Sequence, residues 1–327
     1  MRNKEILKDY VKRINKVINH IENHLHDDLS LKVIANIACF SPFHFHRIFK
    51  AFVGETLSSY IQRLRIERAA FILIYDIKKS ITDIAFDCGF SSSQQLAKTF
   101  KKHYSLTPSE FRVEKNPEFP TVVPSTVYND SDDKFQKLIN QIAFSDTISE
   151  NIKNTFLEKS ASLNIEVKDM PQISVIYIRY IGGFEFETIT RIYNKLFIWA
   201  ESRGLIDNNN SIYVLSWNDP QLTSKNKLRF DICLSIKEDV IPEGDIGTQI
   251  IADGIYAEST YIFENTKSED VEIKMSEDVE TPFVCYWLPT SGYILAGKPV
   301  YIKIQKNDLN RISVDDPVKF YFPLSPI

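Results

Sequence analysis

An internal repeat in the first third of the chain constrains the fold more than any other feature. Residues 34–41 read Ile-Ala-Asn-Ile-Ala-Cys-Phe-Ser, and residues 84–91 read Ile-Ala-Phe-Asp-Cys-Gly-Phe-Ser, an offset of 50 positions. The similarity resumes at an offset of 51, where residues 45–50 match residues 96–101. Each copy has a short apolar helical pattern, a turn that ends in Phe-Ser, and a second helical pattern with a basic end. The repeat therefore predicts two tandem helix-turn-helix units.

Capping signals indicate where these helices begin. Residues 41–42 (Ser-Pro) offer an N-cap followed by proline at the first helical position. Ser80 with Asp83, and Ser91 with Gln94, have the spacing of a capping box. Residues 107–110 (Thr-Pro-Ser-Glu) open a last helix in the same way.

The turn inside each copy needs a backbone with positive φ. Gly89 occupies that position in the second copy, where glycine adopts the conformation at little cost. The repeat places Cys39 at the equivalent position of the first copy, and the sequence offers no reason for a side chain there.

The two copies are joined by residues 55–75, which carry an apolar stripe at helical spacing. A helix of about 20 residues spans about 30 Å, and successive major-groove faces of B-DNA lie about 34 Å apart. One chain is thus expected to hold two recognition helices in adjacent major grooves of double-stranded DNA. The copies differ in sequence, so the operator should be asymmetric, and a monomer is sufficient to read it.

The second helix of each copy supplies the candidate DNA contacts. Phe45, Ile48 and Phe49 form the buried side in the first copy, and Leu96 and Phe100 in the second. Glutamine suits adenine and Arg or Lys suits guanine in the major groove, whereas lysines at a helix end suit phosphates. The side chains expected to contact bases are Phe43, His46, Arg47, Ser93, Gln94, Gln95 and Lys98, and those expected to contact phosphates are Lys50, Lys101 and Lys102.

The distribution of charge agrees with contact to a polyanion in one part only. Residues 1–115 carry 19 basic and 12 acidic side chains, and residues 116–327 carry 20 and 31. No apolar run approaches the roughly 20 residues that span a bilayer, and the N-terminus has no signal-peptide core. Four scattered cysteines suit reduced thiols in a cytoplasm.

The pattern of elements predicts two domains of different class. Residues 1–115 form an all-α domain, and residues 116–162 are a linker with a weak helical pattern at Phe135–Ile142. Residues 163–327 form an α+β domain. Strand-like patterns at 174–180, 212–216, 229–236, 254–263, 299–305 and 318–323 alternate with helical patterns at 187–203 and before Trp287. This order predicts two pseudo-repeated β-α-β-β units with a cleft between them.

Residues 8–112 resemble the AraC/XylS family of bacterial regulators. The resemblance rests on residues 81–92 (Ile-Thr-Asp-Ile-Ala-Phe-Asp-Cys-Gly-Phe-Ser-Ser) and 100–112 (Phe-Lys-Lys-His-Tyr-Ser-Leu-Thr-Pro-Ser-Glu-Phe-Arg). It implies two helix-turn-helix units on one long helix, and it assigns base reading to the same exposed residues of the two recognition helices. Ser105 departs from the family, which usually has glycine there, and the resemblance implies an altered turn.

Residues 163–327 resemble GyrI-like effector-binding domains. The matching segments are 182–183 (Gly-Gly), 217–220 (Trp-Asn-Asp-Pro), 228–233 (Leu-Arg-Phe-Asp-Ile-Cys), 254–257 (Gly-Ile-Tyr-Ala) and 287–293 (Trp-Leu-Pro-Thr-Ser-Gly-Tyr). The resemblance implies an apolar cleft, usually with a buried glutamate opposite a cationic ligand. Ile294 and Ile302 stand where such glutamates are expected, so a neutral or weakly polar ligand is predicted. The predicted cleft residues are Trp217, Tyr256, Trp287, Tyr293 and Tyr301.

The leading hypothesis is a regulator that binds DNA under control of a small molecule, with contact to RNA polymerase as one route of action. Two alternatives stay open for the second domain: a hydrolase of small electrophiles, and a docking domain that binds no ligand. No cofactor is expected. His20 and His24 have i, i+4 spacing, but with no third ligand in the pattern they indicate a solvated helix face rather than a metal site.

Overall fold

The computed structural model describes residues 2–76, 78–115, 163–207, 209–220, 222–238, 240–288, 291–306, 309 and 312–326, with the side chains of 2–5, 285 and 286 left out. The chain divides into two compact units, which are described separately. The first comprises Met1–Glu114 with Ile241–Gly247, and the second comprises Lys115–Val240 with Thr248–Ile327. The predicted linker and its helical pattern lie outside the described residues.

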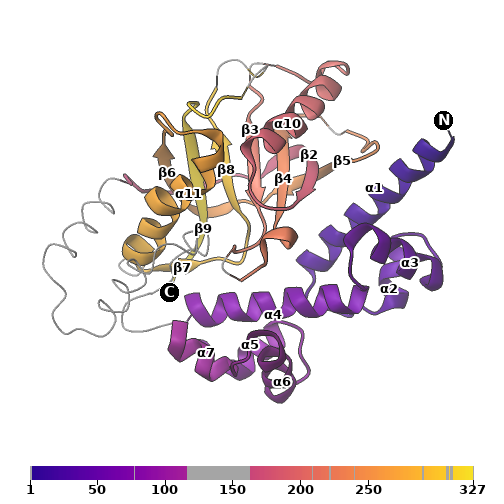
Figure 1. Cartoon of the computed structure of the whole chain (residues 1–327), viewed down its shortest axis with the longest axis vertical. Coiled ribbons are helices and arrows are strands. Elements are labelled where there is room, and N and C mark those ends of the chain that lie inside the picture. The colour runs from indigo at the N-terminus through magenta and orange to yellow at the C-terminus, as the bar shows by residue number, and fades with distance from the viewer. Residues whose placement is uncertain are drawn as a thin grey trace, which may run out of the picture. The chain divides into compact units, whose positions relative to one another are not determined.

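The first unit is helical, as predicted. Its helices are α1 (Arg2–Asn23), α2 (Leu31–Ile37), α3 (Pro42–Val53), α4 (Leu57–Tyr75), α5 (Ile81–Asp87), α6 (Ser93–Tyr104) and α7 (Pro108–Lys115). Figure 1 shows α4 running between the pair α2–α3 and the pair α5–α6. Its 19 residues correspond to a length of about 28 Å, so the connecting helix predicted from the apolar stripe is confirmed.

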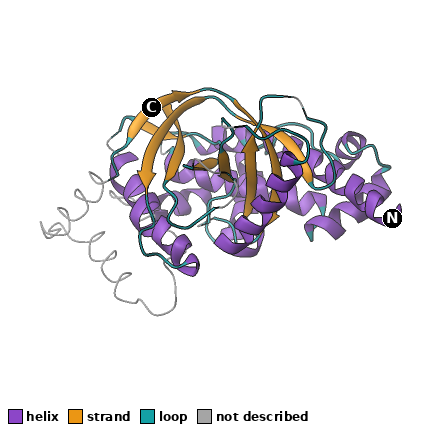
Figure 2. Ribbon diagram, turned by 90° about the horizontal axis from the view of Figure 1, so that it is seen from above, coloured by secondary structure: helices purple, strands orange, loops and turns teal. Residues whose placement is uncertain are grey.

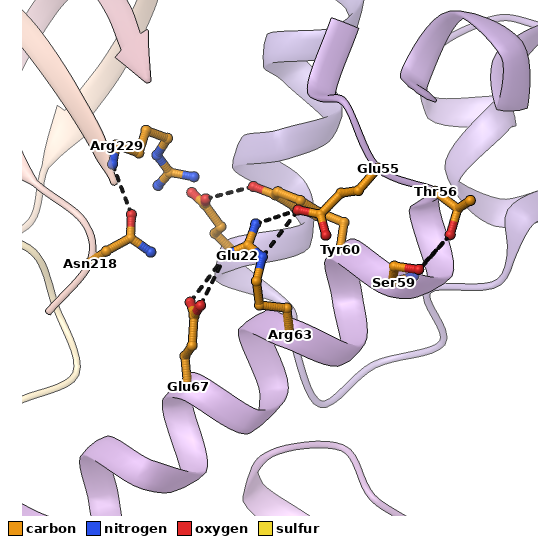
Figure 3. A network of polar contacts seen from close by, with 9 residues as sticks. All are labelled: Glu22, Glu55, Thr56, Ser59, Tyr60, Arg63, Glu67, Asn218 and Arg229. Atoms are coloured by element: carbon orange, nitrogen blue, oxygen red, sulfur yellow. Dashed lines mark hydrogen bonds and ion pairs between the residues drawn. The ribbon is translucent and has the colours of Figure 1, made fainter. Parts of the chain in front are cut away.

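A polar network secures the first half of α4, as Figure 3 shows. The Arg63 guanidinium lies between two carboxylates, with Nη2 2.7 Å from Glu55 Oε1 and Nη1 3.2 Å from Glu67 Oε1. The Tyr60 hydroxyl donates to Glu22 Oε1 over 3.2 Å and thereby ties α4 to α1. The nearly buried Arg63 charge is thus compensated by two carboxylates.

The turns of both helix-turn-helix units have the predicted left-handed backbone. Gly89 has φ 75°, and Cys39 has φ 54° in the equivalent position. Arg13 of α1 donates from Nη1 to the carbonyl oxygens of Ala38 and Cys39, over 3.2 and 3.1 Å. These bonds hold the first turn in the conformation that its cysteine disfavours.

Within the described residues, nine strands form the sheet on which the second unit is built, and helices pack against it; the first two residues of β5 belong to the first unit. The strands are β1 (Glu166–Met170), β2 (Ile173–Ile181), β3 (Ile212–Ser216), β4 (Arg229–Ser235), β5 (Ile246–Ile251), β6 (Gly254–Tyr261), β7 (Tyr293–Leu295), β8 (Val300–Ile304) and β9 (Val318–Pro326). Their order is β1-β6-β9-β8-β3-β4-β2-β5, and β7 pairs with β9. Figure 2 shows how strongly the sheet curves.

Two helical segments cover part of this sheet. Helix α10 (Phe186–Glu201) packs on β4 and β2. Helix α11 (Val271–Met275) continues into two π-helical turns, Ser276–Glu280 and Phe283–Trp287. The ring of Phe283 stacks on Phe322 of β9 with centroids 3.9 Å apart, which fixes the second π-helical turn against the sheet. A helical N-terminal unit and a sheet-rich second unit were both predicted.

Candidate nucleic-acid interface and ligand cavity

Helix α3 presents the predicted residues of the first copy to solvent. The Ser41 hydroxyl caps it by accepting from the backbone N–H of His44 over 3.4 Å. Phe45, Ile48 and Phe49 are buried, which leaves the opposite side exposed. Phe43 is 75% exposed, and the guanidinium of Arg47 lies 5.9 Å from the centre of its ring. His46 and Lys50 are exposed as well.

Helix α6 begins one residue later than the capping box predicted. Ser92, not Ser91, is the N-cap, and its hydroxyl accepts from the N–H of Gln95 over 3.2 Å. The side-chain carbonyl of Gln95 accepts from the N–H and the hydroxyl of Ser91 over 2.8 and 2.9 Å. A bidentate contact to adenine needs both the carbonyl and the amide group of a glutamine, so in this conformation Gln94 is better suited to base reading than Gln95.

The remaining predicted residues of α6 lie on its outer side. Leu96 and Phe100 are fully buried in the core. Ser93 is partly buried, and the exposed candidates are Gln94, Lys98, Lys101 and Lys102. Basic residues in the last turn of α6 also complement the helix dipole. Both second helices therefore offer hydrogen-bonding and cationic side chains on one side, as reading a major groove requires.

In the second unit, alternation along the strands gives the sheet two different faces. One face carries tyrosines from five strands that pack together and are almost fully buried: Tyr177, Tyr213, Tyr256, Tyr301 and Tyr321. The neighbouring residues along β3, β8 and β9 (Val214, Ile302 and Phe320) face the other way. We call these the tyrosine face and the cavity face.

A narrow cavity lies on the cavity face, with a volume of about 30 Å³ in this conformation. Its apolar wall comes from the strands and from α11. The lining residues are Phe184, Val214, Ser216, Asn218, Pro220, Leu228, Phe230, Glu272, Met275, Glu280, Val300, Ile302 and Phe320. Apolar lining with a few polar groups is typical of small-molecule sites, and π-helical turns such as Ser276–Glu280 frequently occur at functional sites.

The five predicted cleft residues do not line this cavity. Tyr256 and Tyr301 belong to the tyrosine face, because side chains alternate along a strand and these two point to the side of the sheet opposite the cavity. Trp217 packs on that same face and donates from Nε1 to Asp231 over 2.8 Å. Trp287 stacks on Phe283, and Tyr293 begins the short strand β7. Periodicity identified the strands but did not identify which side of the sheet the cavity occupies.

The prediction of a neutral ligand did not consider carboxylates from elsewhere in the chain, and this cavity contains two of them. Ile302 does line the cavity, but Glu272 and Glu280 reach it from α11 and the π-helical turn that follows. Glu272 is paired with Lys225 over 3.1 Å. Burial, with the charges of Asp219 and Glu272, raises the pKa of Glu280 to about 7. Helical spacing of Val271, Met275 and Val279 was the sequence signal that could have placed this segment over the sheet.

The tyrosine face holds its carboxylates in internal pairs instead. Arg179 donates to both oxygens of buried Asp231 over 2.8 Å. Glu258 accepts from Lys168, Lys319 and Tyr321 over 2.9, 2.6 and 2.7 Å. Burial of Glu258 opposes ionisation, but these hydrogen bonds outweigh it and hold its pKa at about 2. Both carboxylates are therefore already compensated.

Within the described part of the chain, no group of three His, Cys, Asp or Glu side chains is arranged to hold a metal ion. His20 and His24 stack with ring centres 4.2 Å apart, and burial lowers the pKa of His20. None of the described helices is long and apolar enough to cross a membrane.

Two family models match the chain in separate regions. Residues 34–114 match a helix-turn-helix domain, and residues 163–304 match a GyrI-like small-molecule-binding domain. Each model thus falls on one of the two units.

Named relatives match the helical unit. The Bacillus subtilis HTH-type transcriptional regulator YbfP is 44% identical over 103 residues, which are 32% of this chain and 35% of YbfP. PqrA of Proteus vulgaris, described as a probable transcription factor, is 40% identical over 87 residues, 27% of this chain and 70% of PqrA. A crystal structure of an AraC-type regulator from Chromobacterium violaceum is 31% identical, with a TM-score of 0.29, and the match covers 31% of this chain and 90% of that one. The chain therefore spans about a third of YbfP and most of the two shorter proteins.

Proposed function

Since the chain belongs to the AraC-type helix-turn-helix transcription regulators and carries a GyrI-like small-molecule-binding domain, we propose that a lipophilic organic cation controls its binding to DNA. The ligand occupies the cavity between α11 and the sheet. Its binding changes the affinity for DNA because it stabilises one of two conformational states of the chain.

The observation that carries this proposal is the position of Glu280 in an apolar wall. Glu280 is half-buried and lines the cavity together with Phe230, Met275 and Ile302, so its ionised carboxylate lacks part of the hydration it would have in water. A protonated or quaternary amine supplies the missing countercharge, and its apolar substituents pack on the apolar lining as the narrow cavity widens around them. A neutral ligand would leave Glu280 protonated or poorly solvated, so the cavity favours a cation.

The raised pKa of Glu280 gives ligand binding a pH dependence. Only the ionised form attracts a cation, and with a pKa of about 7 the ionised fraction rises about tenfold between pH 6 and pH 8. Affinity for a permanent cation is expected to rise by about that factor over this interval. In the absence of ligand the folded chain binds more protons than the unfolded chain between pH 4.5 and about 7, so stability falls as pH rises through that window.

The proposal is tested with a matched pair of probes on the full chain. Benzyltrimethylammonium and its neutral isostere, with carbon in place of nitrogen, differ in charge and scarcely in shape. The cation should bind more tightly in calorimetric titration, and Glu280→Gln should weaken it by about tenfold or more without affecting the isostere. Glu277→Gln, an exposed acid on the same π-helical turn, is the control. Equal binding of the two probes, or loss of cation binding in both variants, would contradict the proposal.

For the DNA, we propose that α3 and α6 of one chain read adjacent major grooves of an asymmetric operator. Arg47 and Gln94 are the leading base-reading residues, with Phe43, His46, Ser93, Gln95 and Lys98 beside them and Lys50, Lys101 and Lys102 on phosphates. The length of α4 and the exposure of these side chains support this arrangement. Contact with RNA polymerase is the proposed route to activation of transcription.

The strand order of the second unit supports a pseudo-repeat of β-α-β-β units. The first repeat would consist of β2, α10, β3 and β4. The second repeat would consist of β6, α11, β8 and β9. Across the sheet the six strands lie in the order β2-β4-β3-β8-β9-β6. The strands of the second repeat thus follow in the reverse order of their counterparts in the first, as a pseudo-twofold relation requires.

A further inference from the structure

We infer that Arg65 sets the spacing between the two DNA half-sites that the chain accepts. Arg65 lies near the middle of α4, the helix that connects the two helix-turn-helix units. It is a positioning residue: it acts by holding the two halves of the first unit against each other. This inference rests on the proposal that one chain reads two neighbouring grooves.

The guanidinium of Arg65 is bound to the first half of the unit. Nε donates to the carbonyl oxygen of Leu25 over 2.9 Å, and Nη2 donates to that of Asp27 over 3.1 Å. Both carbonyls belong to the loop between α1 and α2, which precedes the first helix-turn-helix. Two bonds from one planar group fix the orientation of this loop on α4 as well as its distance.

The same guanidinium packs against the turn between α5 and α6 in the second half. A Cβ atom added to Gly89 would lie 2.4 Å from the Leu25 carbonyl oxygen and 2.7 Å from Cζ and Nη2 of Arg65. The backbone of the turn between α5 and α6 therefore lies directly on Arg65 and on the loop that Arg65 holds. We call Leu25, Asp27, Arg65 and Gly89 the brace.

The brace joins the halves at a second point besides the covalent path along α4. A single helix bends gently along its length, and a bend in α4 would change the separation of α3 and α6. A contact between the α1–α2 loop and the α5–α6 turn opposes that bend. With the brace in place, α3 and α6 fit grooves one helical turn apart, and a site lengthened or shortened by a base pair fits poorly.

Two other arginines in the described part of the first unit each bond within one half. Arg13 bonds the turn that contains Cys39, and Arg112 bonds the Lys79 carbonyl next to its own half. These contacts stabilise each half internally. Arg65 therefore governs the spacing of the half-sites, and the exposed side chains of α3 and α6 govern base preference.

The test measures binding to one DNA site with three spacings. A site selected from random DNA by the full chain is prepared with its natural spacing and with one base pair inserted or deleted between the half-sites. Wild type, Arg65→Ala, Arg65→Lys and the exposed-position control Gln62→Ala are compared in fluorescence anisotropy titrations. Circular dichroism confirms folding, and Arg65→Lys serves as the milder variant that keeps the charge.

The expected result is a loss of spacing selectivity. Wild type and Gln62→Ala should bind the altered sites at least about tenfold more weakly than the natural site. Both Arg65 variants should reduce that ratio to about threefold, because a lysine cannot make the two-pronged contact. An unchanged ratio in Arg65→Ala would overturn the inference. It would also be overturned if Arg65→Ala weakened binding equally at all three spacings and Arg65→Lys restored it, because that result would indicate a phosphate contact. If removal of either half-site leaves wild-type affinity unchanged, the two-groove proposal itself fails.

Discussion

The two helix-turn-helix copies of the first unit place their glycine at different points of the same motif. Each copy needs a left-handed residue twice, in its turn and at the end of its second helix. The first copy has Cys39 in the turn (φ 54°) and Gly54 after α3 (φ 83°). The second has Gly89 in the turn (φ 75°) and Ser105 after α6 (φ 63°). Backbone conformation alone does not decide where glycine is found.

The surroundings explain the difference at the turn. A Cβ at Gly54 would meet nothing within 4 Å, whereas one at Gly89 would overlap the Leu25 carbonyl oxygen. Cys39 is exposed to solvent, so its side chain has room. Gly89 is needed for packing as well as for its dihedral angle, and Gly54 for its dihedral angle alone. The second turn is therefore the one that joins the two halves.

Exchanging the turn residues should give the largest effect. Gly89→Cys adds a side chain where there is no space, in addition to the cost of a left-handed residue, and is expected to lower the free energy of unfolding by about 3 kcal/mol. Cys39→Gly removes strain but adds chain entropy, so it should stay within about 1 kcal/mol of wild type. Urea denaturation followed by circular dichroism measures both. Similar losses in the two variants would contradict the comparison.

Removal of the base-reading side chains should affect the two halves of the operator separately. Arg47→Ala is expected to relax preference at a base pair in one half-site, and Gln94→Ala in the other, each at a cost of about 1–3 kcal/mol. Gln95→Ala should change base preference less, because its carbonyl is engaged by Ser91. Binding to a set of single-base operator variants measures this. Relaxation of the same position by both substitutions would show that the copies do not read separate half-sites.

Exchanging the residues after the recognition helices should give smaller and opposite effects. Ser105→Gly relieves a left-handed serine and should stabilise the unit by about 1 kcal/mol, and Gly54→Ser should destabilise it by about the same amount. Thermal unfolding of the two variants measures the shift. A destabilised Ser105→Gly would mean that the serine side chain has a role that its backbone conformation does not reveal.

The smallest expected effect is that of a single phosphate contact. Lys101→Ala should weaken binding to all sequences alike and reduce the slope of log affinity against log salt by about 0.9. Lys16, a lysine of α1 outside the proposed interface, provides the control as Lys16→Ala. A sequence-dependent loss in Lys101→Ala would move this residue from the phosphate contacts to the base contacts.

The sequence predicted the first unit almost completely because its signals are local. The repeat located both helix-turn-helix units and even the positive φ of Cys39. The apolar stripe predicted α4, and the capping box at Ser80 and Asp83 is present, with the Ser80 hydroxyl accepting from the Asp83 N–H. The start of α6 was off by one residue because residues 91–93 are three consecutive serines. In the structure Ser92 caps the helix, because its hydroxyl accepts from the N–H of Gln95.

The sequence predicted the strands of the second unit better than its cavity. Period-two patterns located β2, β3, β4, β6, β8 and β9 within a few residues, but β1, β5 and β7 were missed. The cavity depends on long-range packing. Packing decides that Ile302 and not Tyr301 faces the cavity, and it places the segment after α11 on the sheet through the contact of Phe283 with β9. No short window of sequence contains that information, so Glu280 could not be placed opposite Ile302 in advance.

The most direct test of the account is in vitro selection of binding sites from random DNA by the wild-type chain, with the number of chains per site measured by analytical ultracentrifugation. Two unequal helix-turn-helix copies in one chain predict an asymmetric site, made of two different half-sites about 10 base pairs apart and bound by a single chain. A palindromic site bound by two chains would contradict the account.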